Sequence, residues 1–145
     1  MKLSKLTDYA VVLLSFLSQT GKGPQSANAL ADDTGIPAPT VAKLMKLLAK
    51  AELVTSTRGT AGGYALANAA EAISVADIIA AIEGPIALTA CVEESDDLCA
   101  VENTCGVAGN WESVNAAVRD ALHSVSLTDM SPDWRKMFKE TEIHG

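Results

Sequence analysis

A basic amphipathic segment followed directly by a glycine-rich hairpin is the feature that most restricts how this chain folds. At 100° per residue, residues 39–51 separate an apolar side from a cationic side. The apolar side consists of Val41, Leu44, Met45 and Leu48, and the cationic side consists of Lys43, Lys46 and Lys50. Two β-prone segments follow at 53–57 and 64–66, joined by the glycine-rich residues 58–63. This order predicts a helix with a basic outer face beside a β-hairpin.

The segments before this helix complete a helix-turn-helix pattern. Residues 6–17 are apolar almost all round and predict a buried first helix. Ser26 is a suitable N-cap for a short helix over 27–33, which Gly35 and Pro37 end. Two short helices joined by a glycine-containing turn and followed by a hairpin are typical of a winged helix-turn-helix. The predicted fold class is therefore mainly α with a small β-hairpin wing, to which a long dimerisation helix is added further along the chain.

This arrangement predicts double-stranded DNA as the partner. The basic helix would enter the major groove, and the hairpin glycines would let the backbone approach phosphates closely. The arginine that leads the hairpin suits a minor groove or a phosphate. The predicted DNA contacts are Pro39, Thr40, Lys43, Lys46, Thr57, Arg58, Gly59 and Tyr64. The alternatives are a solvated lysine face on an exposed helix and a plain hairpin with one exposed arginine.

The distribution of charge supports DNA binding, although the total charge does not. The net charge of −7 by itself argues against a polyanionic partner. Residues 1–67 carry seven Lys or Arg against four Asp or Glu, whereas residues 68–145 carry four against fourteen. A basic amino-terminal half on an acidic body is expected where one face meets DNA. The acidic total leaves one alternative: a metal- or thiol-redox-responsive winged-helix module that binds proteins and not DNA.

The carboxyl-terminal half predicts a core helix and then a helix that needs a partner. Ser74 caps a helix over 73–83, which ends at Gly84. Asn110 caps a helix over 110–128 whose apolar residues recur every three or four positions. These residues are Trp111, Val114, Val118, Ala121, Leu122 and Val125. Because a helix of this length is not stable alone, we expect its apolar side to pair with a second copy in a homodimer. The alternative is that the helix folds back onto its own domain.

The chain thus divides into four parts. Residues 1–84 form the DNA-binding domain, 85–109 hold the cysteines, 110–128 form the dimerisation helix, and 129–145 form a polar tail. No segment is long and apolar enough to cross a membrane and the amino terminus does not resemble a signal peptide, so we expect a cytoplasmic protein without a membrane partner. No phosphate-loop motif occurs and no histidine lies near the cysteines in sequence. We therefore expect neither an enzyme nor a small-molecule substrate.

All three cysteines lie in one segment that has no apolar core of its own. Cys91 is followed by seven residues, then Cys99, five residues, and then Cys105. The intervening residues include five Asp or Glu and show no apolar periodicity, so a bound metal would supply the ordering free energy. Structural zinc sites favour CxxC pairs and four ligands, whereas iron–sulfur clusters accept variable thiolate spacing. The spacing favours an iron–sulfur cluster and leaves another metal or a metal-free thiol switch as alternatives.

With these residues in place, the chain resembles the Rrf2 family of winged-helix iron–sulfur transcription regulators over nearly its full length. The motifs that carry the resemblance are LTDYA at 6–10, TRGTAGGY at 57–64, VADII at 75–79 and the three-cysteine segment. Within the family, residues 40–44, 83–88 and 109–111 are most similar to regulators of the SUF iron–sulfur assembly operon. The resemblance implies a homodimer that binds a palindromic promoter and represses assembly genes according to cluster occupancy.

The resemblance also implies a ligand set that the cysteine segment does not complete. Cys91, Cys99 and Cys105 would hold a 2Fe-2S or 4Fe-4S cluster and leave one position for a fourth ligand. IscR-like members carry a histidine three residues after the third cysteine, where this chain has Ala108. NsrR-like members use an aspartate from the first helix of the partner subunit, and Asp8 matches that position. We therefore expect Asp8 as the fourth ligand; the alternative is a carboxylate facing water or the positive end of its helix.

Overall fold

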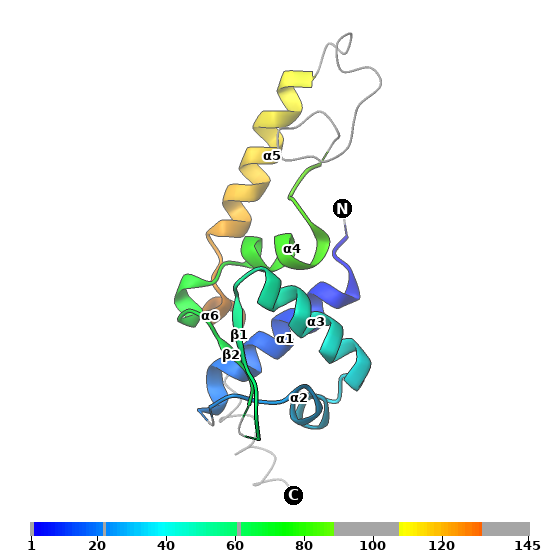
Figure 1. The fold of residues 1–145 in the computed structure, drawn as a ribbon. Helices are drawn as coiled ribbons and strands as arrows, with labels where there is room; N and C mark the ends of the chain where they lie inside the picture. Colours follow the sequence, from blue (N-terminus) through cyan, green and yellow to red (C-terminus); the bar gives the residue numbers. More distant parts are fainter. Residues whose placement is uncertain (1, 22, 61, 89–107, 132–145) are drawn as a thin grey trace, which may run out of the picture.

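The structure, a computed structural model, describes residues 2–21, 23–60, 62–88 and 108–131 (Figure 1). Helix α1 spans Lys5–Thr20 and helix α2 spans Ala27–Thr34. Both begin at a serine, because the hydroxyls of Ser4 and Ser26 accept hydrogen bonds from backbone N–H groups of the first turn. Both end at a glycine in the left-handed conformation. The helices predicted at 6–17 and 27–33 are confirmed, and α1 is longer at both ends.

The third helix leads directly into the hairpin. Helix α3 (Ala38–Lys50) is followed by strands β1 (Val54–Thr57) and β2 (Gly63–Leu66), which pair antiparallel. One residue of the α1–α2 connection extends this pairing: Gln25 N–H donates to the Tyr64 carbonyl at 2.9 Å, and Tyr64 N–H donates to the Gln25 carbonyl at 2.7 Å. The predicted winged helix-turn-helix is confirmed, and its wing is fixed to the helical part along the outer edge of β2.

The chain then leaves the winged helix and returns to it. After a short 3-10 turn (Ala70–Ala72), helix α4 spans Val75–Glu83 and begins with a capping box formed by Ser74 and Asp77. Helix α5 (Ala108–His123) extends away from the winged helix, and α6 (Leu127–Met130) lies back against α1 (Figure 1).

The helix predicted over 110–128 is therefore observed as two helices. Helix α5 begins two residues before Asn110, so this residue lies in the first turn and does not cap the helix. Its carboxyl end is at His123, and Ser126 starts α6 with a second capping box, shared with Asp129. This local capping interrupts an apolar periodicity that by itself predicts one continuous helix.

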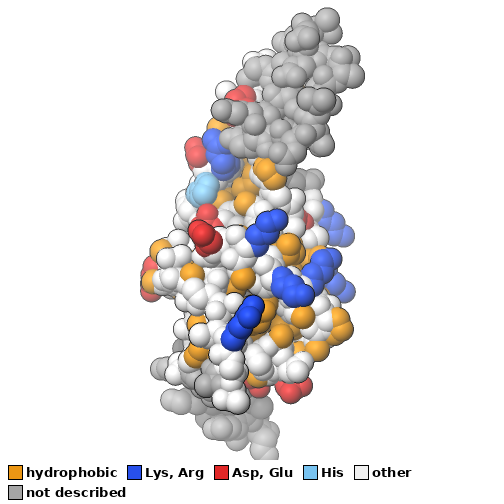
Figure 2. Space-filling model, in the orientation of Figure 1, with side chains coloured by type: hydrophobic (Ala, Val, Ile, Leu, Met, Phe, Trp, Pro, Cys, Tyr) orange, Lys and Arg blue, Asp and Glu red, His pale blue; other side chains and the backbone are white. Residues whose placement is uncertain are grey.

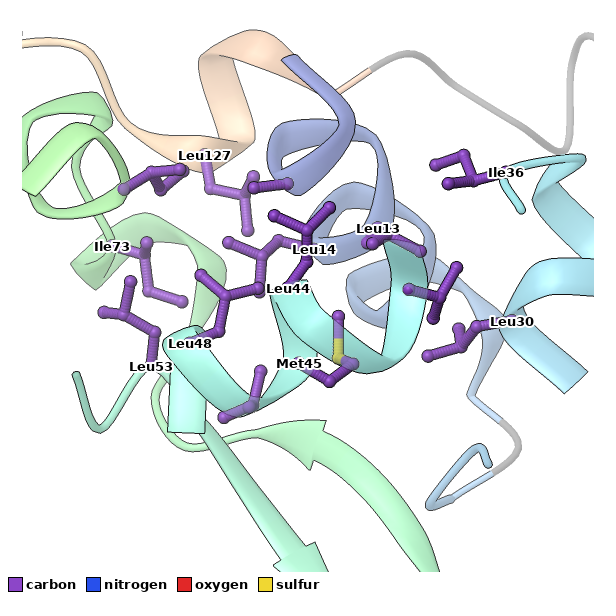
Figure 3. Packing of buried hydrophobic residues seen from close by; sticks show 14 residues of the cluster. Leu13, Leu14, Leu30, Ile36, Leu44, Met45, Leu48, Leu53, Ile73 and Leu127 are labelled. Atoms are coloured by element: carbon purple, nitrogen blue, oxygen red, sulfur yellow. The ribbon is translucent and has the colours of Figure 1, made fainter. Parts of the chain in front are cut away.

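One apolar cluster holds the winged helix together (Figure 3). The large apolar side chains of this cluster that are 0–1% exposed are Leu13, Leu14, Leu30, Val41, Leu44, Met45, Leu48, Ile73, Ile78 and Leu127. Full burial of such a side chain stabilises a fold by about 1.5–3 kcal/mol. Among the residues whose burial the structure describes, the members come from all the helices except α5. Leu127 of α6 is one of them, so the chain after α5 contributes to the core of the DNA-binding domain.

Candidate DNA-binding surface and cluster-ligand positions

Helix α3 divides its residues between core and solvent as its sequence predicts. Its four apolar positions are 0% exposed: Val41, Leu44, Met45 and Leu48. Lys43, Lys46 and Lys50 are exposed on the other side. Pro39 is exposed in the first turn, and Thr40 beside it is half-buried. Three of the four predicted DNA contacts on α3 are thus fully accessible, and the buried apolar row fixes the direction of the cationic side.

The hairpin presents a second set of the predicted contacts. Thr57, Arg58 and Gly59 are exposed at the end of β1 and in the turn that follows it. Tyr64 is half-buried, packs against the apolar cluster and is joined through its backbone to Gln25. Tyr64 therefore braces the hairpin against the helices.

Two hairpin glycines are explained by packing inside the protein. A Cβ atom on Gly63 would overlap the main chain of Gln25, and one on Gly62 would overlap the carbonyl oxygen of Thr57. Gly59, by contrast, has open space around it and a backbone φ of 108°, which residues with a side chain rarely adopt. Close approach of phosphates stays a prediction for the hairpin glycines, and packing inside the protein gives a separate reason for Gly62, at the turn, and for Gly63, against residue 25.

The cationic residues of α3 and the hairpin belong to one face of the molecule. Figure 2 shows Lys and Arg side chains gathered over the middle of this face, where α3 and the hairpin lie in Figure 1. Asp and Glu side chains lie mainly at its margins. This face therefore carries a group of positive side chains over α3 and the hairpin, as a partner with a phosphate backbone requires.

Asp8 lies in the first turn of α1, and its side chain is exposed. It lines an open groove of about 710 Å³ together with Lys2, Lys5, Glu83 and other residues of α1, α4 and α6. The backbone N–H of Ser4 donates to Glu83 Oε1 at 2.6 Å, which fixes the N-terminal segment to the end of α4. This exposure leaves the Asp8 carboxylate accessible to a group from outside the protomer.

The three predicted thiolate ligands, Cys91, Cys99 and Cys105, lie outside the described residues, as does the tail from 132 to 145. Within the described ranges, no three His, Cys, Asp or Glu side chains come together in a group that could hold a metal. The structure therefore shows the segments on either side of the cysteines, at residue 88 and at the start of α5, and leaves the ligand set as a prediction from sequence.

Sequence reasoning missed Asn115, which is 0% exposed in α5. Its side chain amide donates to the Ile86 carbonyl at 2.9 Å, and its side chain carbonyl accepts from Leu88 N–H at 2.8 Å. A signal was present, because at 100° per residue position 115 falls beside Trp111 and Leu122 on the apolar side of the helix. A polar side chain there needs internal partners.

Comparisons with known proteins agree with this architecture. Residues 3–133 match the family model described as "Rrf2: Iron-dependent Transcriptional regulator". The chain belongs to the Rrf2 family. It is 30% identical over 134 residues to the HTH-type transcriptional regulator IscR of Vibrio vulnificus, covering 92% of this chain and 79% of that protein.

Two solved structures of the family are similar along most of the chain. CymR, the global cysteine regulator of Bacillus subtilis, superposes with a TM-score of 0.64 at 30% identity and covers 90% of this chain and 96% of its own. IscR of T. potens superposes with a TM-score of 0.62 at 33% identity and covers 90% of this chain and 85% of its own.

Family membership settles the coarse function. This Rrf2 regulator is a DNA-binding transcription regulator and not an enzyme, since its relatives are transcriptional regulators. The alternative of a winged helix that binds only proteins is therefore not supported. None of the helices among the described residues is long and apolar enough to cross a membrane.

Proposed function

We propose that this Rrf2 regulator is a homodimeric, iron–sulfur-dependent repressor of SUF iron–sulfur assembly genes. The observation that carries the proposal is the exposed carboxylate of Asp8 on an open groove of the same chain that carries three clustered cysteines. A ligand set shared between two copies would join α1 of one copy to the cysteine segment of the other. Dimerisation and cluster binding would then be one linked equilibrium.

The donor set fits an iron–sulfur cluster. Cys91, Cys99 and Cys105 supply three thiolates, and Asp8 of a second copy supplies a carboxylate. Lys2 and Lys5 line the groove beside Asp8, and the cysteine segment contains five Asp or Glu between its cysteines. These opposite charges favour docking of the segment of one copy on the groove of the other. When bound, a cluster supplies iron–thiolate bonds whose free energy contributes to folding of the segment.

The homodimer accounts for the exposed apolar residues of α5. Trp111 and Val114 are 41% and 46% exposed in the protomer. Pairing these helices would cover both side chains and place two copies of α3 on one face. Two recognition helices in successive major grooves lie about 34–36 Å apart, so we expect a palindromic site with that spacing. Occupation of such a site within a promoter would repress transcription.

The DNA interface of each copy would consist of the outer side of α3 and the hairpin. In this proposal Lys43 and Thr40 would reach base edges, Lys46 would reach a phosphate, and Arg58 would reach the minor groove or a phosphate. Pro39, Thr57 and Gly59 are exposed at the margins of the same surface. Tyr64 packs against the apolar cluster and would support the hairpin that carries Arg58.

A second candidate is thiol-based sensing without a cluster. CymR carries the name of a global cysteine regulator, and its structure superposes on 90% of the present chain. In that case the three cysteines would act as reversible thiols, and Asp8 would have no ligand role.

Anaerobic purification followed by reconstitution with ferrous iron and sulfide separates the two candidates. We expect a coloured protein with visible absorbance, stoichiometric iron and sulfide, and a salt-dependent gel shift with the promoter of a SUF operon. A well-folded protein that retains neither iron nor sulfide would contradict the cluster proposal and favour thiol sensing. Specific binding only to unrelated promoters would contradict the SUF assignment and leave the cluster intact.

Replacing Asp8→Ala tests the fourth ligand. We expect about a tenfold faster loss of the cluster to a chelator, because removal of groups at a metal site weakens affinity by this order. The apo variant should keep its helical circular dichroism and its dimeric state, since Asp8 is exposed. Asp33→Ala, an exposed carboxylate of α2, is the matched control and should behave as wild type. Equal cluster lifetimes in Asp8→Ala and Asp33→Ala would exclude Asp8 as a ligand.

A further inference from the structure

The hairpin is fixed to helix α3 at the point where β1 begins. Two residues after the end of α3, Glu52 adopts the left-handed conformation, with a backbone φ of 62°. Glu52 N–H donates to the Ala49 carbonyl at 3.0 Å, and Leu53 N–H donates to the Leu48 carbonyl, also at 3.0 Å. These two bonds form a Schellman motif, which satisfies the last carbonyls of a helix and turns the chain out of it. The start of β1 therefore has a defined direction relative to α3.

The other strand of the hairpin is fixed at the start of α2. Gln25 pairs with Tyr64 of β2 through two backbone hydrogen bonds, of 2.9 and 2.7 Å. The next residue, Ser26, is the N-cap of α2, and its hydroxyl accepts from Ala29 N–H at 3.1 Å. Helix α2 packs in turn against α3. The hairpin is thus held by backbone hydrogen bonds at both helices of the helix-turn-helix.

Gly63, the first residue of β2, allows the close approach of this strand to Gln25. A Cβ atom on Gly63 would lie 2.8 Å from the backbone nitrogen of Ser26 and closer still to the Gln25 carbonyl group. Both obstacles are main chain beside a helix cap, so they cannot move aside as the end of a flexible side chain can. The φ of 150° at Gly63 adds strain for any residue with a side chain. Substitution at position 63 therefore displaces β2 from Gln25.

A displacement at position 63 reaches Arg58 through one residue. Thr57 is the partner of Gly63 across the hairpin, and Arg58 follows Thr57 directly. The Thr57 hydroxyl also donates to the Gly63 carbonyl at 3.5 Å. The cationic side of α3 is held separately, by the buried row of apolar residues on the same helix. A shift of the hairpin would thus move Arg58 relative to the lysines of α3.

We propose that Gly63 is a positioning residue for DNA binding, which holds Arg58 where it meets the same duplex as Lys43 and Lys46. The proposal rests on the DNA interface proposed above. A hairpin that is already fixed relative to α3 binds more tightly, because less conformational freedom is lost when both elements contact one duplex. Gly63 acts through Arg58, and its own backbone need not touch a phosphate.

The test is a double-mutant cycle on DNA binding by the full-length protein. The probe is a duplex of about 30 base pairs, long enough for two half-sites one helical turn apart, selected from a random pool by the wild-type protein. Gly63→Ala should weaken binding about tenfold, the order of one lost side chain contact, and should lower the salt slope by about one unit, as Arg58→Ala does. The combined variant should bind no more than about twofold more weakly than Arg58→Ala alone.

A pair of variants at position 25 tests the same pairing from the other side. Gln25→Pro removes the N–H that donates to the Tyr64 carbonyl and adds no atom at position 63. It should also weaken DNA binding and lower the salt slope. Gln25→Ala keeps the backbone N–H and should bind DNA as wild type, because the pairing uses only backbone atoms. This pair keeps the test decisive if Gly63→Ala does not fold.

A core variant separates positioning from general loss of stability. Ile78→Val shortens a side chain that is 0% exposed in α4 and should lower the thermal midpoint. It should leave the affinity for DNA and the salt slope unchanged at temperatures where the protein is folded. If Ile78→Val weakens DNA binding as much as Gly63→Ala does, the positioning role is wrong.

The remaining outcomes distinguish this inference from the proposed function. Losses in Gly63→Ala and Arg58→Ala that multiply in the combined variant would overturn positioning through Arg58, and so would wild-type affinity in both Gly63→Ala and Gln25→Pro. Either result leaves the proposed DNA interface standing. Wild-type affinity and slope in Arg58→Ala would instead remove Arg58 from the proposed interface and overturn the inference with it.

Discussion

The winged helix and α5 differ in how far their apolar side chains are buried. In the winged helix, apolar residues from five helices and the hairpin meet in one cluster and are almost fully buried (Figure 3). In α5, the only fully buried side chain among residues 110–123 is the polar Asn115, whereas Trp111 and Val114 are more than 40% exposed. The winged helix is complete within one chain, and α5 has an apolar side that one chain does not cover.

The apolar side of α5 differs in exposure between its two ends. Val118 and Leu122 are half-buried within the protomer, and α5 contacts α4, while Trp111 and Val114 at the other end are exposed. Sequence periodicity left two alternatives for this helix, a partner or its own domain. In the protomer, the carboxyl-terminal part of α5 is anchored to its own domain, and its amino-terminal part presents the surface that we assign to the homodimer.

The largest expected effect concerns the core to which α6 contributes. Leu127→Ala should destabilise the protein by about 2–5 kcal/mol, because it leaves a cavity where a side chain is 0% exposed. Chemical unfolding followed by circular dichroism measures this change. Met130→Ala, at a residue 48% exposed on the same short helix, is the control and should change stability by less than about 0.5 kcal/mol. Similar small losses in both variants would show that α6 is peripheral to the winged helix.

A smaller effect is expected at the exposed part of α5. Val114→Glu should raise the dissociation constant of the homodimer about tenfold or more, since it buries an unpaired charge in the proposed interface. The stability of the protomer should not change, because Val114 is 46% exposed in it. Sedimentation equilibrium measures the dimer constant, and Ser113→Glu adds the same charge at the preceding exposed position as a control. An unchanged dimer constant would assign the interface to another surface.

The smallest effect is expected on the outer side of α3. Lys46→Ala should weaken DNA binding across sequences and reduce the slope of log affinity against log salt by about one unit, because one phosphate contact is lost. The fold should not respond, since Lys46 is exposed. Lys46→Arg keeps the charge at the same position and should leave the slope unchanged. An unaltered slope in Lys46→Ala would move this lysine off the DNA.

Local sequence patterns predicted most of the DNA-binding domain. The alternation of apolar and cationic residues in α3, the serine caps of α2 and α4, and the glycines of the hairpin all act within a few residues of chain. Such patterns can be recognised in a sequence because the interactions that produce them join residues close together in the chain. These patterns do not report the packing constraint at Gly63, where the atoms that exclude a side chain belong mainly to Gln25, far away in sequence.

The sequence by itself determined that this chain is a winged helix with a basic recognition helix and three clustered cysteines. Only the tertiary structure decided that Asp8 is exposed on a groove, that Leu127 belongs to the core, and that Asn115 joins α5 to residues 86 and 88. The physical reason is that burial and long-range hydrogen bonding depend on which surfaces meet, and periodicity within one helix does not specify its neighbour.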